Sequence, residues 1–565
     1  MSGLRRCVEA CALAVALAAC GDSTGPAIPD LSGEWLFSEF LILGPEDECL
    51  ASGNVVFAQT GATLGGTATR VSGCAQFTPL GGSAPTGQVT DSGVTFAFGL
   101  CQHTGTFQSG SRDSIAGTLT CSTTSVTGTW LAVRVGPAAT LVLTPAARTM
   151  VIGGTTSLAT LLTDAAGHPL FGRAVAWTSD NPAAVTVASS GATSGQATAA
   201  GAGSATVTAT AGGVSANGHF TVKVVQFTSV SADAYRTCGL SSTGEAWCWG
   251  GAVLGDGTGA SSLTAVGVAG GLTFASVSNG VNACALATSG AAYCWGQYAG
   301  LGGGVPTAVP GGVVFTSLSA GSSDHFCGVT NTGAAMCWGN NTSGQLGNGL
   351  GLPSATPVTV LGGHVFASVS SGGYHNCGLT PTGAPWCWGS NYAGALGDGS
   401  TTGSAVPVAV AGGLSFTSLS AGTYGTCGIV GGAAYCWGRN EEGQLGIGST
   451  DINPHPTPQP IAGGLMFSMV SSSFSFSCGI TTSGAAWCWG TNTWGQLGNG
   501  TTTDSRVPVP VSGGLTFALV SVGTTYACGI TTGGVAYCWG NNDSGQLGNG
   551  SSVGGSVPVR VAGQP

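Results

Sequence analysis

The chain has 565 residues, 101 of them glycine, and only 6% of its residues are charged. Twelve Lys and Arg residues against 22 Asp and Glu give a formal net charge of −10, which is too little positive charge for phosphate contacts and excludes nucleic-acid binding. Glycine inside a helix costs about 1 kcal/mol relative to alanine, so this composition also argues against a helical protein. We therefore expect an all-β protein with several domains.

The first 20 residues have the pattern of an export signal. Two arginines precede an apolar stretch (residues 10–19), which ends in the motif LAACG around Cys20. This pattern resembles a bacterial lipoprotein signal peptide with its lipobox, which implies lipidation of Cys20 and a place in the cell envelope, periplasmic or on the surface. An ordinary secretory signal is the alternative. No later run has the length of a membrane helix, so we expect membrane attachment through the lipid alone, after a tether at residues 21–30.

Residues 31–135 alternate apolar and polar positions around many glycines, which predicts a small β-barrel or sandwich. Trp35 and Trp130 lie in matching Gly-x-Trp triplets near its two ends. The pattern resembles lipocalin-type barrels, which implies an apolar ligand, with plain core aromatics as the alternative. Four cysteines in this segment can form two disulfides in three pairings. They are Cys49, Cys74, Cys101 and Cys121.

Residues 137–224 resemble a bacterial immunoglobulin-like domain of group 2. The resemblance rests on LVLTP at 141–145, VAWTSDNPAAV at 175–185 and GAGSATVTA at 201–209. Apolar residues alternate within these stretches, so each strand has one inward face, as in a β-sandwich. The resemblance implies a spacer or an adhesion module, and we favour the spacer because a sandwich by itself specifies no function.

The triplet Cys-Trp-Gly occurs seven times after residue 225, at intervals of 43 to 52 residues. A period in this range is typical of a propeller or a solenoid. Each copy contains four short apolar runs separated by Gly, Ser, Asn and Asp, which predicts four strands. Seven units of four strands predict a seven-bladed β-propeller over residues 225–565.

A second cysteine precedes each triplet by ten residues, or by nine in one copy. If the two cysteines face each other across a hairpin, they are close enough for a disulfide, and the three-residue loop needs a glycine in third position. All six ten-residue copies have that glycine, and the other copy has Gly431-Gly432. Zinc is the alternative, but structural zinc usually takes cysteines two to four residues apart. The expected pairs are Cys238–Cys248, Cys284–Cys294, Cys327–Cys337, Cys377–Cys387, Cys427–Cys436, Cys478–Cys488 and Cys528–Cys538.

These disulfides need an oxidising compartment, which agrees with the export signal. The repeats resemble the regulator of chromosome condensation family, on the motifs SAG at 420–422, CGL at 377–379, AYCWG at 536–540 and GQLG at 545–548. The first two copies shorten the GQLG loop. We also expect the last strand, at residues 557–561, to join the first blade and close the ring.

The family resemblance implies more than one function. Its best-known member exchanges nucleotide on a GTPase and binds nucleosomes, and exchange activity is one alternative for this chain. The acidic charge and the predicted export argue against it. Other bacterial members resemble a secreted inhibitor that caps β-lactamases with the loops of one propeller face, which implies a binding role.

We predict the binding surface from positions at which the copies differ. The residue two before the first cysteine of each pair changes from blade to blade, and aromatics stand beside it and in the GQLG loops. Aromatic and Arg side chains are frequent hot spots of interfaces, with burial between blades as the alternative. The candidates are Tyr235, Arg236, Tyr298, His325, Tyr374, His375, Tyr392, Tyr424, Phe474, Phe476, Trp494 and Tyr526.

A propeller enzyme or a metal-binding protein is the alternative. His325 and His375 occupy the same position in adjacent blades, near Asp324, and Glu441-Glu442 is another acidic pair. No third metal ligand has a recognisable spacing, and no catalytic motif occurs. We therefore expect no catalysis, no cofactor and no metal. The sequence predicts a monomeric, lipid-anchored envelope protein whose propeller binds an unknown protein or glycan.

Overall fold

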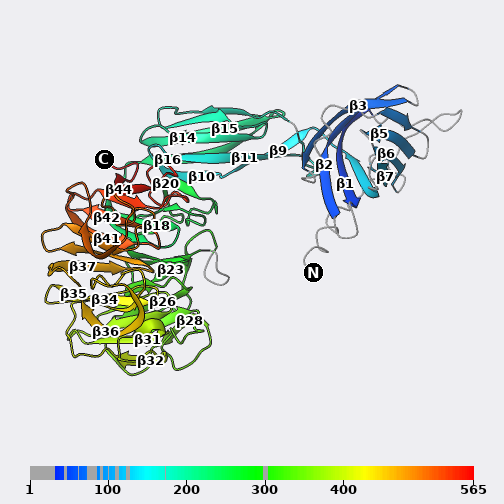
Figure 1. Cartoon of the computed structure of the whole chain (residues 1–565). Coiled ribbons are helices and arrows are strands. Elements are labelled where there is room, and N and C mark those ends of the chain that lie inside the picture. The colour runs from blue at the N-terminus through cyan, green and yellow to red at the C-terminus, as the bar shows by residue number, and fades with distance from the viewer. Residues whose placement is uncertain are drawn as a thin grey trace.

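The computed structural model describes residues 32–565 except for 43–47, 61–62, 73–85, 90–92, 99–100, 109–113, 122–126, 172 and 297–302. Three bodies follow one another along the chain, and strands form nearly all of their regular structure (Figure 1). The predicted signal peptide with Cys20, the tether, Cys74 and Tyr298 lie outside the described residues. No helix in the described part of the chain is long and apolar enough to cross a membrane.

The first body is a closed barrel of eight strands in sequential order, in which β1 pairs with both β2 and β8. Trp35 and Trp130 are buried inside it among phenylalanine side chains, so both belong to the core. The backbone register places Cys101 opposite Cys121, and the side chains of the four cysteines lie outside the described part. The strands are β1 (Gly33–Ile42), β2 (Glu48–Thr60), β3 (Thr63–Ser72), β4 (Thr86–Val89), β5 (Gly93–Phe98), β6 (Cys101–Phe107), β7 (Ser114–Cys121) and β8 (Thr127–Arg134).

The second body packs two sheets face to face as a β-sandwich, as the alternation in the sequence predicted. One sheet has the order β13-β14-β11-β9, and the other contains β12, β15, β16 and β10. Leu158, Val185, Val207 and Phe220 fill the space between them. The strands are β9 (Ala138–Thr144), β10 (Ala147–Val151), β11 (Thr155–Asp164), β12 (Ala176–Ser179), β13 (Val185–Ser189), β14 (Ser194–Ala199), β15 (Gly203–Ala211) and β16 (Val214–Lys223).

The third body contains seven four-stranded antiparallel blades, each built from four consecutive strands; six are separate sheets, and the first is continuous with a sheet of the second body. Neighbouring sheets contact each other through their first strands, and β17 of the first sheet contacts β41 and β42 of the last. The predicted all-β propeller is therefore confirmed. Blade 1 is β17 (Phe227–Ala232), β18 (Arg236–Ser241), β19 (Ala246–Gly250) and β20 (Ser262–Gly267). Blade 2 is β21 (Phe274–Asn279), β22 (Ala283–Ala287), β23 (Ala292–Trp295) and β24 (Thr307–Ala308), and blade 3 is β25 (Phe315–Ala320), β26 (His325–Thr330), β27 (Ala335–Gly339) and β28 (Ser354–Thr359).

The other four blades repeat this order. Blade 4 is β29 (Ser368–Ser371), β30 (His375–Leu379), β31 (Pro385–Gly389) and β32 (Ser404–Ala409), with the short 3-10 helix η2 (Tyr392–Gly394) before its last strand. Blade 5 is β33 (Ser418–Ala421), β34 (Gly425–Val430), β35 (Ala433–Asn440) and β36 (Asp451–Pro460). Blade 6 is β37 (Phe467–Ser472), β38 (Phe476–Thr481), β39 (Ala486–Gly490) and β40 (Ser505–Pro510). Blade 7 is β41 (Phe517–Val522), β42 (Tyr526–Thr531), β43 (Ala536–Gly540) and β44 (Gly555–Arg560).

The cysteine pairs of the propeller lie in the predicted register. The second and third strands of each blade bring the paired cysteines opposite each other with Cα atoms 4.0–4.1 Å apart, and all seven pairs form disulfides. The six predicted loop glycines have φ between 77° and 87°, and Gly431 and Gly432 have φ of 56° and 91°. Glycine takes such backbone angles without steric cost, so the register follows from the cysteine spacing and the loop glycine.

A serine in the first strand of each blade links that blade to the next one around the ring. Its Oγ accepts a hydrogen bond from a backbone N–H in the first strand of the next blade, at 2.9–3.2 Å. The last of these bonds joins Ser521 of blade 7 to the Ala232 N–H of blade 1. The serines are Ser231, Ser278, Ser319, Ser370, Ser420, Ser471 and Ser521.

The last strand stays in its own blade. β44 pairs with β43, and β20 completes blade 1 from the first repeat, so the expectation that the last strand joins the first blade is wrong. The cycle of serine hydrogen bonds and the C-terminal tail close the ring instead. In the tail, the Gly563 carbonyl accepts a hydrogen bond from the Val225 N–H at 3.0 Å, and Val561 packs in one cluster with Val151 and Val225.

The sandwich and the propeller share a sheet. β10 pairs with β20, the outer strand of blade 1, at Met150 and Val266, so eight strands run continuously from β12 to β17. Beside this pairing the Arg148 guanidinium lies 2.7 Å from the Asp256 carboxylate, and both side chains are buried. The sandwich therefore covers an edge that would otherwise leave backbone groups of blade 1 unpaired.

Candidate functional site

Five of the predicted binding residues are buried in the propeller, and for them the prediction of an accessible binding surface is wrong. Each is at most 6% exposed. Each begins the second strand of its blade, and the strands in this position, such as β18, β30 and β38, are buried along their whole length. The residues are Arg236, His325, His375, Phe476 and Tyr526. Their variation from blade to blade reflects packing between blades.

Arg236 and Tyr526 tie blades 7, 1 and 2 together. The Arg236 guanidinium donates to Asn279 Oδ1 at 3.0 Å and to the Val253 carbonyl at 2.8 Å, and the Tyr526 hydroxyl donates to the Arg236 carbonyl at 2.8 Å. Burial lowers the pKa of Arg236 and raises that of Tyr526, while the charge of nearby Asp233 favours the Arg236 cation. The buried polar groups of Arg236 and Tyr526 therefore have their hydrogen-bond partners inside the ring.

The two histidines are also used inside the ring. His325 Nε2 lies 3.1 Å from Asn376 Oδ1, and His375 Nε2 lies 2.8 Å from Thr426 Oγ1, each in the next blade. Burial lowers the pKa of His325 to about 4 and that of His375 to about 3, so both are neutral at pH 7. In the part of the chain that the structure describes, no three His, Cys, Asp or Glu side chains are grouped to hold a metal ion.

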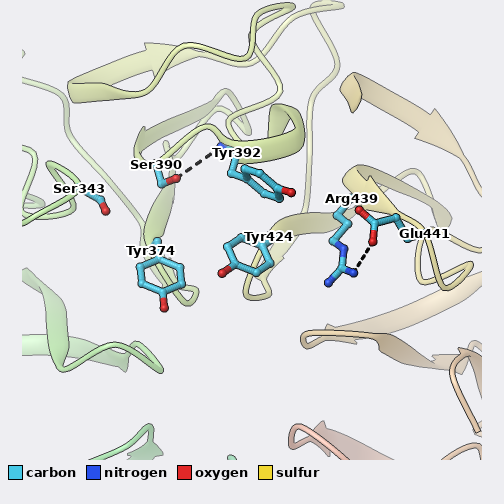
Figure 2. A pocket seen from close by; sticks show the side chains of 7 residues that line it. All are labelled: Ser343, Tyr374, Ser390, Tyr392, Tyr424, Arg439 and Glu441. Carbon is cyan, nitrogen blue, oxygen red and sulfur yellow. Dashed lines mark hydrogen bonds and ion pairs between the residues drawn. The ribbon is translucent and has the colours of Figure 1, made fainter. Parts of the chain in front are cut away.

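Four other candidates come together on one face of the ring (Figure 2 shows three of them). Tyr374 stacks on Tyr424 with ring centroids 5.6 Å apart, and Tyr392 meets Tyr424 edge-on at 5.1 Å. Phe474 also meets Tyr424 edge-on, with ring centroids 5.8 Å apart, and Arg439 lies over the Phe474 ring at 4.9 Å. We name these five residues the aromatic cluster.

The propeller topology explains why residues from three repeats meet. Successive strands of a blade run in opposite directions, so the loops after the first and the third strand open on the same face. Tyr374, Tyr424 and Phe474 follow the first strands of blades 4, 5 and 6, whereas Tyr392 follows the third strand of blade 4 and Arg439 lies near the end of the third strand of blade 5. Disulfide-linked strands hold both kinds of loop, so the cluster stands on a rigid base.

The aromatic cluster borders an open pocket of about 420 Å³. A second hollow of about 110 Å³ adjoins it, with Tyr392, Arg439 and Glu441 in both linings and Ile452 and Pro454 in the second alone. The lining of the main pocket consists of Ser343, Tyr374, Ser390, Tyr392, Tyr424, Arg439 and Glu441.

The pocket carries one ion pair and no net charge. Arg439 donates to the Glu441 carboxylate (Figure 2), which raises the pKa of Arg439 and lowers that of Glu441. Burial, and then the neighbouring Tyr374, raise the pKa of Tyr424. At neutral pH the pocket therefore holds one cation and one anion.

Arg439, Ser343 and Ser390 were not predicted as binding residues from the sequence, and Glu441 was considered only for an enzyme. A signal for this place was present: the repeat of blade 5 has the nine-residue hairpin and is followed by the longest interval, 52 residues. The extra length forms β36, which has ten residues where the last strands of blades 4 and 6 have six. That longer strand begins at the second hollow.

Two further candidates are exposed but lie outside the lining of either hollow. Tyr235, in blade 1, is 68% exposed, and Trp494, in blade 6, is 49% exposed. Tyr235 follows the first strand of its blade just as Tyr374 and Tyr424 do, three residues before a paired cysteine. It therefore provides a natural comparison for the residues of the pocket.

Fold and pocket together define a disulfide-linked β-propeller with an aromatic site on one face. The propeller contains RCC1 repeats: the model of the regulator of chromosome condensation (RCC1) repeat matches residues 332–379, 431–480, 483–530 and 533–565. A second model of the same repeat matches residues 315–345, 366–395 and 517–546. No curated protein matches the chain in sequence.

Solved structures resemble the propeller at low sequence identity. Human WBSCR16 is 18% identical with a TM-score of 0.50, over 59% of this chain and 94% of that one. Prp20p from Saccharomyces cerevisiae, whose structure was described with its binding to Gsp1p and histones, is 21% identical with a TM-score of 0.47, over 53% and 81%. The ectodomain of the Arabidopsis thaliana receptor kinase ACR4 is 23% identical with a TM-score of 0.37, over 55% and 95%. At these identities the likeness extends to the fold alone.

Proposed function

We propose that this protein is a lipid-anchored, non-catalytic binding protein of the bacterial cell envelope, and that its propeller holds a partner at the aromatic cluster. The observation that carries the proposal is the cluster itself: three tyrosine rings and an Arg–Glu pair from blades 4 and 5 line one open pocket. Tyrosine and arginine on rigid loops are the residues that most often dominate binding energy.

The location in the envelope is supported by chemistry at both ends of the chain. The lipobox-like motif at Cys20 provides a route out of the cytoplasm, and the seven hairpin disulfides are of a kind that persists in oxidising compartments. A protein with this location would not meet a cytosolic GTPase. For this reason we favour binding over nucleotide exchange.

The non-catalytic role is supported by how the titratable groups of the ring are used. His325 and His375, the best candidates for chemistry in the sequence, each hold a neighbouring blade through Nε2. Asp324 accepts a hydrogen bond from Asn282 at 2.7 Å. Glu441 pairs with Arg439. Each group therefore already has a structural partner.

Affinity capture tests the binding proposal. Mature protein without the signal peptide is immobilised and exposed to an envelope extract of the producing bacterium, beside Tyr392→Ala and Tyr235→Ala variants. Because Tyr392 is 58% exposed and Tyr235 is 68% exposed, neither change should alter folding. We expect Tyr392→Ala to lose most of the captured partner and Tyr235→Ala to keep it. Equal capture by both variants would exclude the aromatic cluster as the binding site.

A further inference from the structure

We propose that the pocket beside the aromatic cluster binds an uncharged sugar ring of a glycan. This inference rests on the proposed function, and it narrows the partner from a protein or a glycan to a carbohydrate. The pocket volume of about 420 Å³ lies near the lower end of the range of about 300–1,000 Å³ that is usual for small-molecule sites. That size suits a small ring, whereas a protein interface usually buries about 800 Å² on each partner.

The side chains that line the pocket are all polar at their ends. All seven lining residues end in a hydroxyl, a guanidinium or a carboxylate, and the lining contains no aliphatic side chain. Pockets that hold the hot spot of a protein partner are apolar and become dry on binding. A lining of this kind instead suits a ligand that is covered with hydroxyl groups, because each hydroxyl both donates and accepts hydrogen bonds.

The three tyrosine rings of the pocket are arranged to receive a flat ligand. Tyr374 and Tyr424 are nearly parallel, at 15°, and Tyr392 stands at 61° to Tyr424. A pyranose has flat patches of C–H groups with hydroxyls around its rim, so it can lie on a phenol ring while its rim meets polar groups. Tyrosine offers both parts, an apolar face and a hydroxyl. The exposed ring of Tyr392 is the natural platform, since it borders both hollows.

The two charges in the pocket, those of Arg439 and Glu441, form an ion pair. Arg439 and Glu441 place a donor and an acceptor side by side, and their side chains are 15% and 34% exposed. Two neighbouring hydroxyls of a sugar can accept from the first and donate to the second. The charge of Arg439 is already balanced by Glu441, and the whole chain carries −10. An anionic ligand would therefore gain little here, which favours a neutral sugar over a uronic acid or a phosphate.

The second hollow extends the binding surface beyond the main pocket. It continues from the first across Tyr392, Arg439 and Glu441 toward Ile452 and Pro454 at the start of β36. A ligand longer than one ring can therefore extend along the surface that blades 4 and 5 form at this hollow. We expect short oligosaccharides to bind more tightly than single sugars, because the second ring adds contacts in this hollow.

The test is calorimetric titration of the mature protein with free neutral sugars. The probes are glucose, galactose, mannose and N-acetylglucosamine, the β-1,4-linked trimers of glucose and N-acetylglucosamine, and glucuronic acid as the charged counterpart of glucose. We expect at least one neutral sugar to bind, and we expect its trimer to bind more tightly than the single sugar. Glucuronic acid should bind more weakly than glucose. Absence of binding by every neutral probe would overturn the inference.

Three variants locate the binding. Tyr392→Ala should weaken the best neutral probe at least tenfold, Tyr392→Phe should keep most of the affinity because the ring face remains, and Tyr235→Ala should bind like the unmodified protein. An unchanged affinity in Tyr392→Ala would place the sugar elsewhere and overturn the inference.

A second arm separates this inference from the proposed function. The envelope extract is treated either with periodate, which destroys sugar rings, or with protease, before capture by the immobilised mature protein. Tyr392-dependent capture that survives protease and is lost after periodate supports the glycan. If a protein is still captured after periodate treatment, and its capture depends on Tyr392, the proposed function stands and the glycan inference is overturned. Capture that does not depend on Tyr392 would overturn both.

Discussion

At the scale of single residues, one position serves different purposes in different blades. The residue two before the paired cysteine is Arg236 in blade 1, His375 in blade 4 and Tyr526 in blade 7, and each bonds across the boundary to a neighbouring blade. A buried polar group needs such partners, because leaving one unsatisfied costs about 1–3 kcal/mol. Chemical variety at a repeated position can therefore indicate a boundary between blades as readily as a binding surface.

The buried histidines predict how stability depends on pH. Their folded-state pKa values, about 4 for His325 and about 3 for His375, lie below the unfolded value of 6.5. The unfolded chain therefore binds more protons than the folded one between these values, and stability is lost as the pH falls from 6.5. For His325 the loss should be on the order of 3 kcal/mol once the pH reaches about 4.

Urea unfolding between pH 7 and pH 4 measures this loss. The comparison protein carries His325→Asn and His375→Asn, since Asn282 fills this position in blade 2. Burial raises the pKa of Asp233, which acts in the opposite sense in part of the range, but both proteins share that effect. The variant should therefore show a flatter pH profile than the unmodified protein. Parallel profiles would show that the histidines do not titrate in this way.

At the scale of elements, the hairpin is the unit that the sequence predicts best. Its register depends only on the spacing of two cysteines and on one glycine, both local features. The pocket was predicted only in part, because its residues come from loops about 50 residues apart, and sequence alone does not say which loops meet. The burial of the second strands was not predicted for another reason: both of their faces pack against other blades, so they lack the alternation that marks an exposed face.

The hairpin disulfides should each contribute to stability. Cys427 and Cys436 close the shortest loop, and in the chain-entropy model closing about ten residues is worth about 2.5–3 kcal/mol. We expect the double variant Cys427→Ala and Cys436→Ala to lose at least that much in guanidinium unfolding, since both side chains are also buried. The same measurement on reduced protein is the control, because the two proteins should then differ much less. A double variant as stable as the oxidised parent would contradict this contribution.

At the scale of the whole molecule, the sandwich does more than separate two bodies. The seam between the last and the first blade has one serine hydrogen bond, the contacts of Arg236 and Tyr526, and the C-terminal tail. β10 pairs with the outer strand of blade 1, and Val151 at the end of β10 packs with Val561 of the tail. The sequence predicted a spacer here. In the structure the sandwich also braces the place at which the ring closes, which local patterns in the sequence do not reveal.

The buried pair of Arg148 and Asp256 tests whether this brace matters. Removing one partner from a buried ion pair leaves an uncompensated charge, which typically costs 3–5 kcal/mol. We expect Arg148→Met and Asp256→Ala each to lower the melting temperature of the propeller and to expose the junction near residue 151 to protease. The double variant should lose less than the sum of the two, because neither charge is then left alone. If the decreases in melting temperature add up in the double variant, the two residues act independently. If the propeller melts at an unchanged temperature in all three variants, the ring closes without help from the sandwich.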